Sequence, residues 1–303
     1  MKRQGTLGAL VHPLTAAAFL DRHWPRVPLV AHGAIDRLGD WVAKDAFADL
    51  SKLLRGKHDG IRAWAHRSGR RGSGGARVTV EAAEQLRSSR DVTLSVDGVS
   101  FPALDRFRKR LAGELGTPAR ATQCNVYVSP RGSGTAAHFD SHEVFFLQLA
   151  GRKRWRYAKA DEFPFPPGFA FDEGKFTAVE TDGQGLFAGR APSLPRRMTS
   201  KVLSPGSVLF LPRGYWHVPT TLEDSVHLTV GLNVPTFRHL LLERIGQMLM
   251  GDPRWREPAA SLFLKAGSPS QERARAKLAA LLRELRPIVA ALGEGSVLGR
   301  RRS

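Results

Sequence analysis

The chain has 303 residues, is 42% hydrophobic and carries a formal net charge of +18. These values exclude a globally disordered protein and allow one large domain, alone or with a helical appendage. No segment has the roughly 18 consecutive apolar residues of a membrane span, and we expect neither a membrane protein nor a secretory signal. The single cysteine, Cys124, rules out an intramolecular disulfide and is typical of a reducing, cytoplasmic location.

The positive charge has two interpretations. A field of this size attracts phosphate-rich or acidic partners, so an acidic or RNA-containing partner is one hypothesis. Alternatively, the abundance of Arg together with Ala and Gly reflects the composition of a GC-rich genome. The charge alone names no partner.

The first of three successive regions, residues 1–117, is expected to consist of helices and some strand that support a barrel. The segment His66–Arg77, rich in Gly, Ser and Arg, is predicted to be an exposed loop. The helical patterns lie near Thr15, in Asp45–Arg55, after Thr79, and in Phe101–Gly116, whose apolar stripe is Leu104, Phe107, Leu111 and Leu115.

The second region, residues 118–235, consists of short alternating or apolar runs separated by Gly and Pro. Such a pattern predicts an antiparallel barrel or sandwich. The runs are QCNVYV, EVFFLQLA, KRWRY, FTAVE, KVLS, SVLFLP and SVHLTVGLN. The segment Phe163–Phe171 contains too many prolines for a central strand and is predicted to be a loop. The third region, residues 236–303, is predicted to be helical, with a kink at Pro287.

A candidate metal site lies in the second region. In a strand, residues two apart point to the same face, so His138 and Asp140 are expected to project together. His217, which follows an apolar strand, is the best candidate for a third ligand. Two His and one carboxylate form the facial triad of non-haem Fe(II) oxygenases. A purely structural His-x-Asp pair, a zinc hydrolase, and ligation by His142 or His227 are the alternatives.

The run KRWRY places a cation in the predicted barrel. Lys153 shares a strand face with Trp155 and Tyr157, and a face with two aromatic residues is expected to point inward. A buried ammonium group is costly without an anion, which a dicarboxylate cosubstrate would supply. The alternative is that the Lys153 side chain extends to solvent.

Further polar residues are candidates for the lining of the pocket. Asn125 and Tyr127 share a strand face and offer hydrogen bonds to a carboxylate, although an ordinary core tyrosine is the alternative. In the last strand Ser225, His227 and Thr229 share a face. Since either face of this strand can point inward, His227 and Thr229 are retained only as pocket-lining candidates.

The sequence resembles a known family. NVYVSPRGSGTAAHFDSHEVFFLQLAGRKRWRY, with SPGSVLFLPRGYWHVP and SVHLTVGLN downstream, is similar to the JmjC-type cupin oxygenases of the ribosomal-oxygenase group, which includes hydroxylases of ribosomal proteins. The resemblance implies a double-stranded β-helix, with helices before and after it, that binds Fe(II) and 2-oxoglutarate.

The same resemblance assigns roles to the candidate residues. It implies that His138, Asp140 and His217 bind the metal, that Lys153 binds the far carboxylate of 2-oxoglutarate, and that Asn125 and Tyr127 line the cosubstrate pocket. Thr229 is added as a pocket residue.

The expected function is hydroxylation of an amino-acid side chain in a protein or peptide, either a ribosomal protein or the precursor of a modified peptide. A lysine or arginine demethylase and a non-catalytic, RNA-binding cupin are the alternatives. Ribosomal oxygenases carry a dimerisation region and then a winged helix, and the 68 residues after Pro235 suffice for the former, so a homodimer through these helices is expected.

Overall fold

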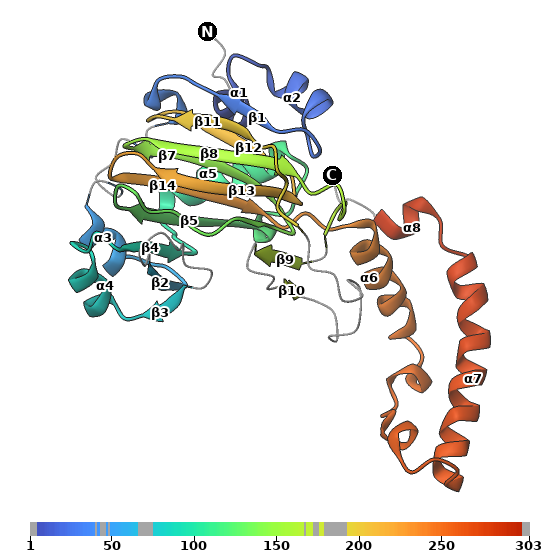
Figure 1. Ribbon diagram of the computed structural model, residues 1–303. Coiled ribbons are helices and arrows are strands. Elements are labelled where there is room, and N and C mark those ends of the chain that lie inside the picture. Colours follow the sequence, from blue (N-terminus) through green and yellow to red (C-terminus); the bar gives the residue numbers. More distant parts are fainter. Residues whose placement is uncertain are drawn as a thin grey trace. The chain divides into compact units, whose positions relative to one another are not determined.

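The computed structural model describes residues 5–39, 41–42, 47, 49–65, 75–166, 168–171, 176–178 and 193–298 (Figure 1). The chain forms two compact units, Met1–Val234 and Pro235–Ser303. None of the described helices is long and apolar enough to span a lipid bilayer.

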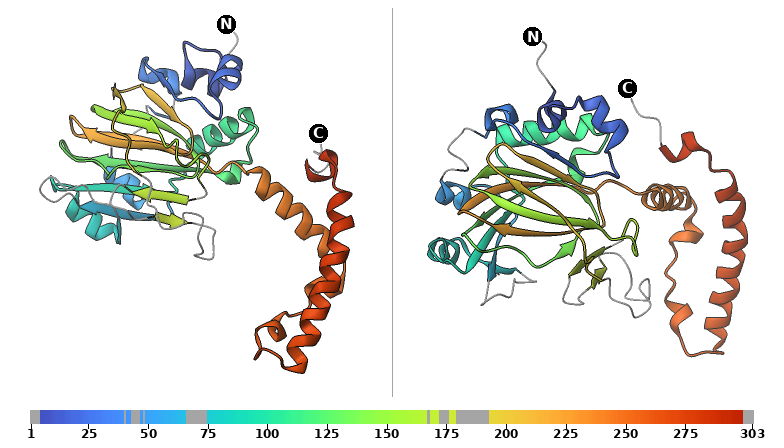
Figure 2. Two further views of the ribbon diagram at one scale, coloured as in Figure 1. Left: turned by 45° about the vertical axis from the view of Figure 1, so that its right-hand side comes forward. Right: turned by 45° about the horizontal axis from the view of Figure 1, so that its top comes forward.

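The first unit is built on two antiparallel sheets, which Figure 2 shows from two further sides. The eight-stranded sheet has the order β1 (Leu29–Ala31), β12 (Val208–Leu211), β7 (Glu143–Ala150), β14 (Ser225–Leu232), β5 (Thr122–Ser129), β4 (Val92–Asp97), β2 (Gly60–Ala65), β3 (Ala76–Val78). The six-stranded sheet has the order β10 (Phe176–Ala178), β9 (Gly168–Phe171), β6 (His138–Phe139), β13 (Tyr215–Thr221), β8 (Lys153–Lys159), β11 (Thr199–Leu203). The prediction of a mainly β protein with helices, built as a double-stranded β-helix, is confirmed.

The apolar run in β7 is continuous because both faces of the eight-stranded sheet are covered. Phe145 packs outward against Phe19 and Phe210, with ring centroids 5.8 and 4.9 Å away. This outer layer holds α1 (Thr6–Val11), α2 (Ala16–Arg22) and α5 (Pro102–Glu114), whose buried residues join the same cluster as the sheet. Phe146 points to the other side and packs on Trp155, with ring centroids 4.1 Å apart. The alternation along one strand therefore divides the core into two layers.

The strand β8 alternates in the same way. Lys153, Trp155 and Tyr157 are buried, whereas Arg154 and Arg156 are exposed. The turn before β8 is fixed by Gly151, which has φ +63°, and a Cβ atom there would come within 2.1 Å of the carbonyl oxygen of Asp224. Only glycine fits this close approach without displacing backbone.

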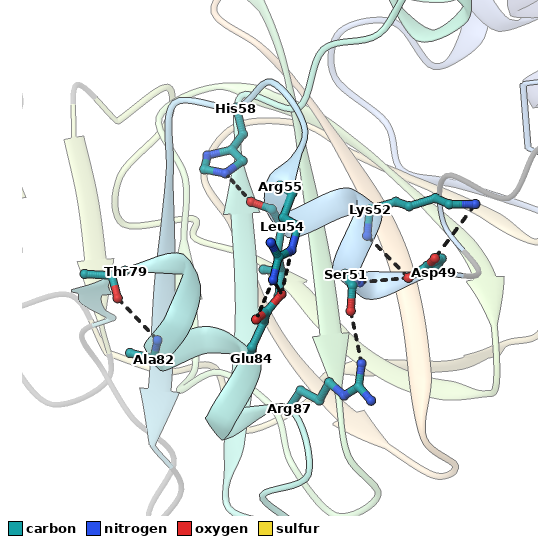
Figure 3. A network of polar contacts seen from close by, with 10 residues as sticks. All are labelled: Asp49, Ser51, Lys52, Leu54, Arg55, His58, Thr79, Ala82, Glu84 and Arg87. Carbon is teal, nitrogen blue, oxygen red and sulfur yellow. Dashed lines mark hydrogen bonds and ion pairs between the residues drawn. The ribbon is translucent and has the colours of Figure 1, made fainter.

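Small helices flank strands of the N-terminal part. The helix α3 (Leu50–Arg55) begins later than the predicted Asp45, because the Asp49 carboxylate accepts hydrogen bonds from the backbone N–H groups of Ser51 and Lys52 and caps it there (Figure 3). The helix α4 (Val80–Leu86) begins after Thr79, whose hydroxyl accepts a hydrogen bond from the backbone N–H of Ala82. Two 3-10 turns, Ile35–Leu38 and Ala119–Ala121, also belong to the first unit.

Two predicted loops are partly wrong. Residues 76–78, at the end of the predicted loop 66–77, form β3 and pair with β2, while residues 66–74 lie outside the described residues. Residues 168–171, at the end of the predicted loop 163–171, form β9 and pair with both β6 and β10. The prolines that argued against a strand all precede β9, so they do not interrupt its hydrogen bonding.

The second unit is helical. It contains α6 (Phe237–Leu249), α7 (Pro269–Ala290), α8 (Glu294–Leu298) and two 3-10 turns, Pro253–Arg256 and Ala260–Phe263. The helix α7 continues through Pro287 to Ala290. Within the described part of this unit only Gln271 and Leu281 are buried, so most apolar side chains of α6 and α7 are accessible.

Candidate active site

A cavity of about 460 Å³ opens between the two sheets of the first unit. Its lining comes from β5, β7 and β14 on one side and from β6, β8 and β13 on the other, with β2 and β4 extending one wall. Both the candidate metal ligands and the inward-facing lysine line it.

Three candidate ligands meet at this cavity. Ligand atoms of His138, Asp140 and His217 all lie within 4.8 Å of one another, and Nε2 of His217 is 3.7 Å from Oδ2 of Asp140. His138 and His217 are directly paired across β6 and β13, which brings together two residues far apart in sequence. Asp140 follows immediately after β6.

Backbone carbonyl groups orient both imidazole rings. The ring N–H at Nδ1 of His138 donates to the carbonyl oxygen of Ala136 at 2.8 Å, and Nδ1 of His217 donates to that of Tyr215 at 2.9 Å. This fixes the tautomer in which the Nε2 lone pair is available to a cation. The arrangement fits a divalent metal.

The ionisation of the three groups also suits a cation. Burial lowers the pKa of His217 to about 4, and the positive charge of a protonated His138 acts in the same direction. Burial opposes ionisation of Asp140, but the charges of His142, His138 and His217 outweigh it and lower the pKa of this carboxyl group. A neutral imidazole and an ionised carboxylate are the forms that bind metals.

Lys153 is buried deeper in the cavity, with only 1% of its surface exposed. Its ammonium group donates to Oγ of Ser129 at 2.8 Å and to Nδ1 of His227 at 2.9 Å. Burial lowers the pKa of Lys153 to about 7. Burial, with the adjacent Lys153 charge, holds the pKa of His227 well below its usual value, so the ring accepts this hydrogen bond as a neutral group. The alternative that Lys153 extends to solvent is wrong.

The other predicted pocket residues also line the cavity. Asn125 uses Oδ1 to accept a hydrogen bond from the backbone N–H of Gly98 at 2.9 Å. Tyr127 stacks on His227 with ring centroids 4.9 Å apart, and burial raises the pKa of its hydroxyl, which keeps the phenol a hydrogen-bond donor. The hydroxyl of Thr229 is buried and has no hydrogen-bond partner among the described residues.

Several lining residues are not identified by the sequence patterns. The indole Nε1 of Trp155 is buried and has no hydrogen-bond partner in the described part of the chain. One wall comes from β2 and β4, outside the predicted barrel region, and carries an ion pair between Arg62 and Asp97 at 2.9 Å. The sequence feature that could have indicated these strands is the period-two spacing of the polar and aromatic residues at positions 62, 64, 93 and 97.

A buried ion pair joins two segments next to the candidate ligands. The Arg213 guanidinium donates two hydrogen bonds to the Glu143 carboxylate, at 2.6 and 2.7 Å, and a third to the carbonyl oxygen of Val234. Glu143 begins the strand after Asp140, and Arg213 lies four residues before His217. The pair therefore joins the two segments that carry these candidate ligands.

We expect Glu143→Gln to lower the free energy of unfolding by about 3–5 kcal/mol, because it leaves the Arg213 guanidinium buried without its carboxylate. The matched control is Glu84→Gln, which breaks the exposed Arg55–Glu84 pair shown in Figure 3 and is expected to cost less than about 1 kcal/mol. Denaturant unfolding monitored by circular dichroism measures both. Equal losses in the two variants would contradict this expectation.

Residues 103–240 match the family model of the JmjC domain. With the two-sheet barrel and its cavity, this match shows that the chain contains a JmjC-type cupin domain, and the relatives below support the resemblance to the ribosomal-oxygenase group seen in the sequence. The class is that of oxygenases dependent on Fe(II) and 2-oxoglutarate.

Three known proteins show what the chain is similar to. The chain is 27% identical over 265 residues to the uncharacterized protein YxbC of Bacillus subtilis, covering 85% of this chain and 80% of that protein. It is 28% identical over 246 residues to a bifunctional lysine-specific demethylase and histidyl-hydroxylase NO66 of Drosophila pseudoobscura pseudoobscura, covering 74% of this chain but 22% of that protein. The fold is shared with YcfD, a ribosomal oxygenase from Escherichia coli solved with cobalt and succinic acid, at 20% identity and a TM-score of 0.53, covering 93% of this chain and 68% of that chain.

Proposed function

We propose that this protein hydroxylates an amino-acid side chain of a protein or peptide, using Fe(II), 2-oxoglutarate and oxygen. The observation that carries the proposal is the presence of two His, one carboxylate and a buried lysine in one cavity. The reaction consumes 2-oxoglutarate and O2, converts a substrate C–H bond to C–OH, and releases succinate and CO2.

In this proposal His138, Asp140 and His217 hold the metal. Their hydrogen bonds to backbone carbonyl groups keep the two rings in place before the metal binds, so little reorganisation is needed. Three protein ligands leave coordination positions open, and Fe(II) there supplies the oxidising chemistry of the class. Phe146 and Trp155 give this part of the cavity an apolar lining.

The far carboxylate of 2-oxoglutarate is assigned to Lys153. A dianionic cosubstrate supplies the negative charge that this buried ammonium group lacks. Neutral hydrogen-bonding groups on β5 and β14 also line the cavity, from Asn125, Tyr127 and Thr229. The indole N–H of Trp155, which has no partner among the described residues, is a further donor that the sequence did not predict. Ser129 and His227 orient the lysine.

The pKa of Lys153 makes cosubstrate binding depend on pH. Above about pH 7 the free protein loses the Lys153 proton, so binding of 2-oxoglutarate requires proton uptake, and the dissociation constant is expected to rise by up to about tenfold per pH unit. The free energy of unfolding is expected to change with pH in the favourable direction, whereas cosubstrate affinity falls as pH rises. The folded-state pKa lies below the ordinary 10.5, so the Lys153 contribution to the free energy of unfolding increases with pH between these values.

Isothermal titration in buffers of different ionisation enthalpy measures the proton uptake, and denaturant unfolding between about pH 7 and 9 measures the stability. Lys153→Met is expected to remove the Lys153 contribution from both profiles. A cosubstrate affinity that does not change between these pH values would contradict this assignment.

The substrate is tested with candidate proteins and peptides, including ribosomal proteins. Incubation with Fe(II), 2-oxoglutarate and oxygen is expected to give succinate and a mass increase of one oxygen atom, detected by mass spectrometry. The name of the Drosophila relative raises demethylation as a second candidate. Release of formaldehyde from a methylated peptide would favour it, and absence of succinate with every substrate and without substrate would overturn both.

We also propose that the second unit forms a homodimer. Its described helices expose large apolar side chains, with Phe237 87% and Leu242 53% exposed. Burying such side chains against a second copy is favourable, at about 25 cal/mol per Å². Sedimentation is expected to show a dimer that Phe237→Glu/Leu242→Glu dissociates and Glu243→Gln does not. A monomeric wild-type chain would contradict the proposal.

A further inference from the structure

Exposed cations gather on the outer side of the six-stranded sheet, opposite the cavity. We call this surface the β8–β11 basic face; it comprises Arg154, Arg156, Arg196 and Arg197. All four are exposed, and none of them forms an ion pair with any residue that the structure describes. A smaller group of three exposed cations lies on α5.

The alternation of β8 creates this face. Arg154 and Arg156 point outward because Lys153 and Trp155 point into the cavity. Across the pair with β11 they lie opposite Val202 and Ser200. Two residues along a strand span about 6.6 Å, so the two guanidinium groups repel each other.

The segment before β11 adds Arg196 and Arg197. It is held to the same side of the sheet because Leu194 and Met198 pack against the buried cluster that contains Val218. Val218 is the cross-strand partner of Arg156. The two arginines of this segment are therefore anchored on the side where Arg156 points.

Acidic groups near this face that the structure describes have other partners. Glu223 pairs with Arg152 at 2.7 Å, Asp161 pairs with Lys159 at 3.3 Å, and Glu162 accepts a hydrogen bond from the Ser193 hydroxyl at 3.2 Å. Like charges on neighbouring strand positions are destabilising. Binding an anion would relieve this repulsion.

The surface suits a polyphosphate better than an acidic protein. Protein interfaces have an apolar, often aromatic centre, whereas Val202, 38% exposed, is the one exposed large apolar residue of β8 and β11. All four cations are arginines, whose planar guanidinium groups match phosphate oxygens. We propose that the β8–β11 basic face binds the phosphate backbone of RNA, without reading sequence.

This inference does not depend on the catalytic proposal, because none of the four residues lines the cavity. Its consequence is that the enzyme would be held on an RNA-containing assembly while the cavity, on the other side of the same sheet, remains open. Binding and turnover can therefore fail separately.

The experiment compares two triple variants of the full chain. Arg154→Gln/Arg156→Gln/Arg197→Gln removes three positive charges from the basic face. Arg106→Gln/Lys109→Gln/Arg110→Gln removes the same charge from the exposed side of α5. Fluorescence anisotropy with labelled poly(U) RNA measures the dissociation constant from about 50 to 200 mM salt, a range over which phosphate contacts weaken strongly.

We expect the basic-face variant to bind poly(U) at least tenfold more weakly, with a salt slope reduced by about 2, since each single-strand phosphate contact contributes about 0.7. The α5 variant is expected to stay within about twofold of wild type. Both variants should release succinate like wild type, which shows that they are folded; if the enzyme has no turnover, circular dichroism supplies this control.

Three outcomes would overturn the proposal. The wild-type chain could fail to bind poly(U) at about 150 mM salt, where exposed charges separated by more than about 8 Å are largely screened. The two variants could lose equal affinity, in which case the general charge of the chain is responsible. Poly-glutamate of matched length could bind more tightly than poly(U), which would indicate an acidic protein partner.

Discussion

Replacing Asp140 with alanine is expected to abolish succinate release. The change removes the one carboxylate from the three candidate ligands and leaves two neutral imidazoles, which hold a divalent cation weakly. Since loss of a group that only orients a ligand typically costs about 10–100-fold, we expect more than a 100-fold loss of turnover. Steady-state succinate formation measures it.

The readout that separates a ligand from a structural residue is metal binding. Titration of the protein with Co(II), followed by its visible absorbance, should show saturable binding by wild type and little by Asp140→Ala. Asp161→Ala removes an exposed carboxylate whose only described ion pair is with Lys159 and should leave both turnover and cobalt binding unchanged. Turnover by Asp140→Ala at more than a tenth of the wild-type rate would reject the triad.

Replacing Lys153 is expected to weaken 2-oxoglutarate binding severely. A hydrogen bond to a charged group contributes about 1.5–3 kcal/mol, so Lys153→Met or Lys153→Ala should raise the KM for 2-oxoglutarate by about 10–150-fold. Lys153→Arg keeps the charge and should be partly tolerated. Succinate formation at varied 2-oxoglutarate concentration measures the change.

Stability provides the control for Lys153. Burying its ammonium group without an anion is unfavourable in the cosubstrate-free protein, and methionine fills a similar volume without a charge. The free energy of unfolding of Lys153→Met should therefore stay level or rise while cosubstrate affinity falls. A variant that loses stability and keeps its KM would show that Lys153 serves the fold instead of the cosubstrate.

The period-two pattern of strands allowed much of the barrel to be predicted. It placed Lys153 and Trp155 inward and Arg154 outward, and the structure agrees because both faces of β8 have distinct surroundings. The proximity of His138 and His217 could only be proposed as a hypothesis. It depends on pairing between strands that begin 77 residues apart, and no local sequence pattern determines such pairing.

Other parts could not be read from local pattern. The strand β14 is buried on nearly its whole length, so its sequence did not say which face carries the cavity, and only the structure places Thr229 there. The cavity wall that contains Arg62 and Asp97 comes from β2 and β4, which extend the sheet beyond β5. No pattern in the sequence of β5 indicates that further strands pair with it. The start of α3 was missed because the Asp49 cap outweighs the helical pattern before it. The roles of the individual cavity residues stay predictions for the experiments above.

The fixed turn at Gly151 gives β8 a vulnerability. Buried residues that line the cavity alternate along β8 with exposed arginines, so the strand fits its surroundings in one register only. A single residue inserted at this turn would shift the register of β8 by one residue. The side chains of Arg154 and Arg156 would then point into the cavity, and that of Lys153 would point to solvent. Deletions and insertions here should thus be far less tolerated than point changes, and a library of length variants at this corner would reveal it.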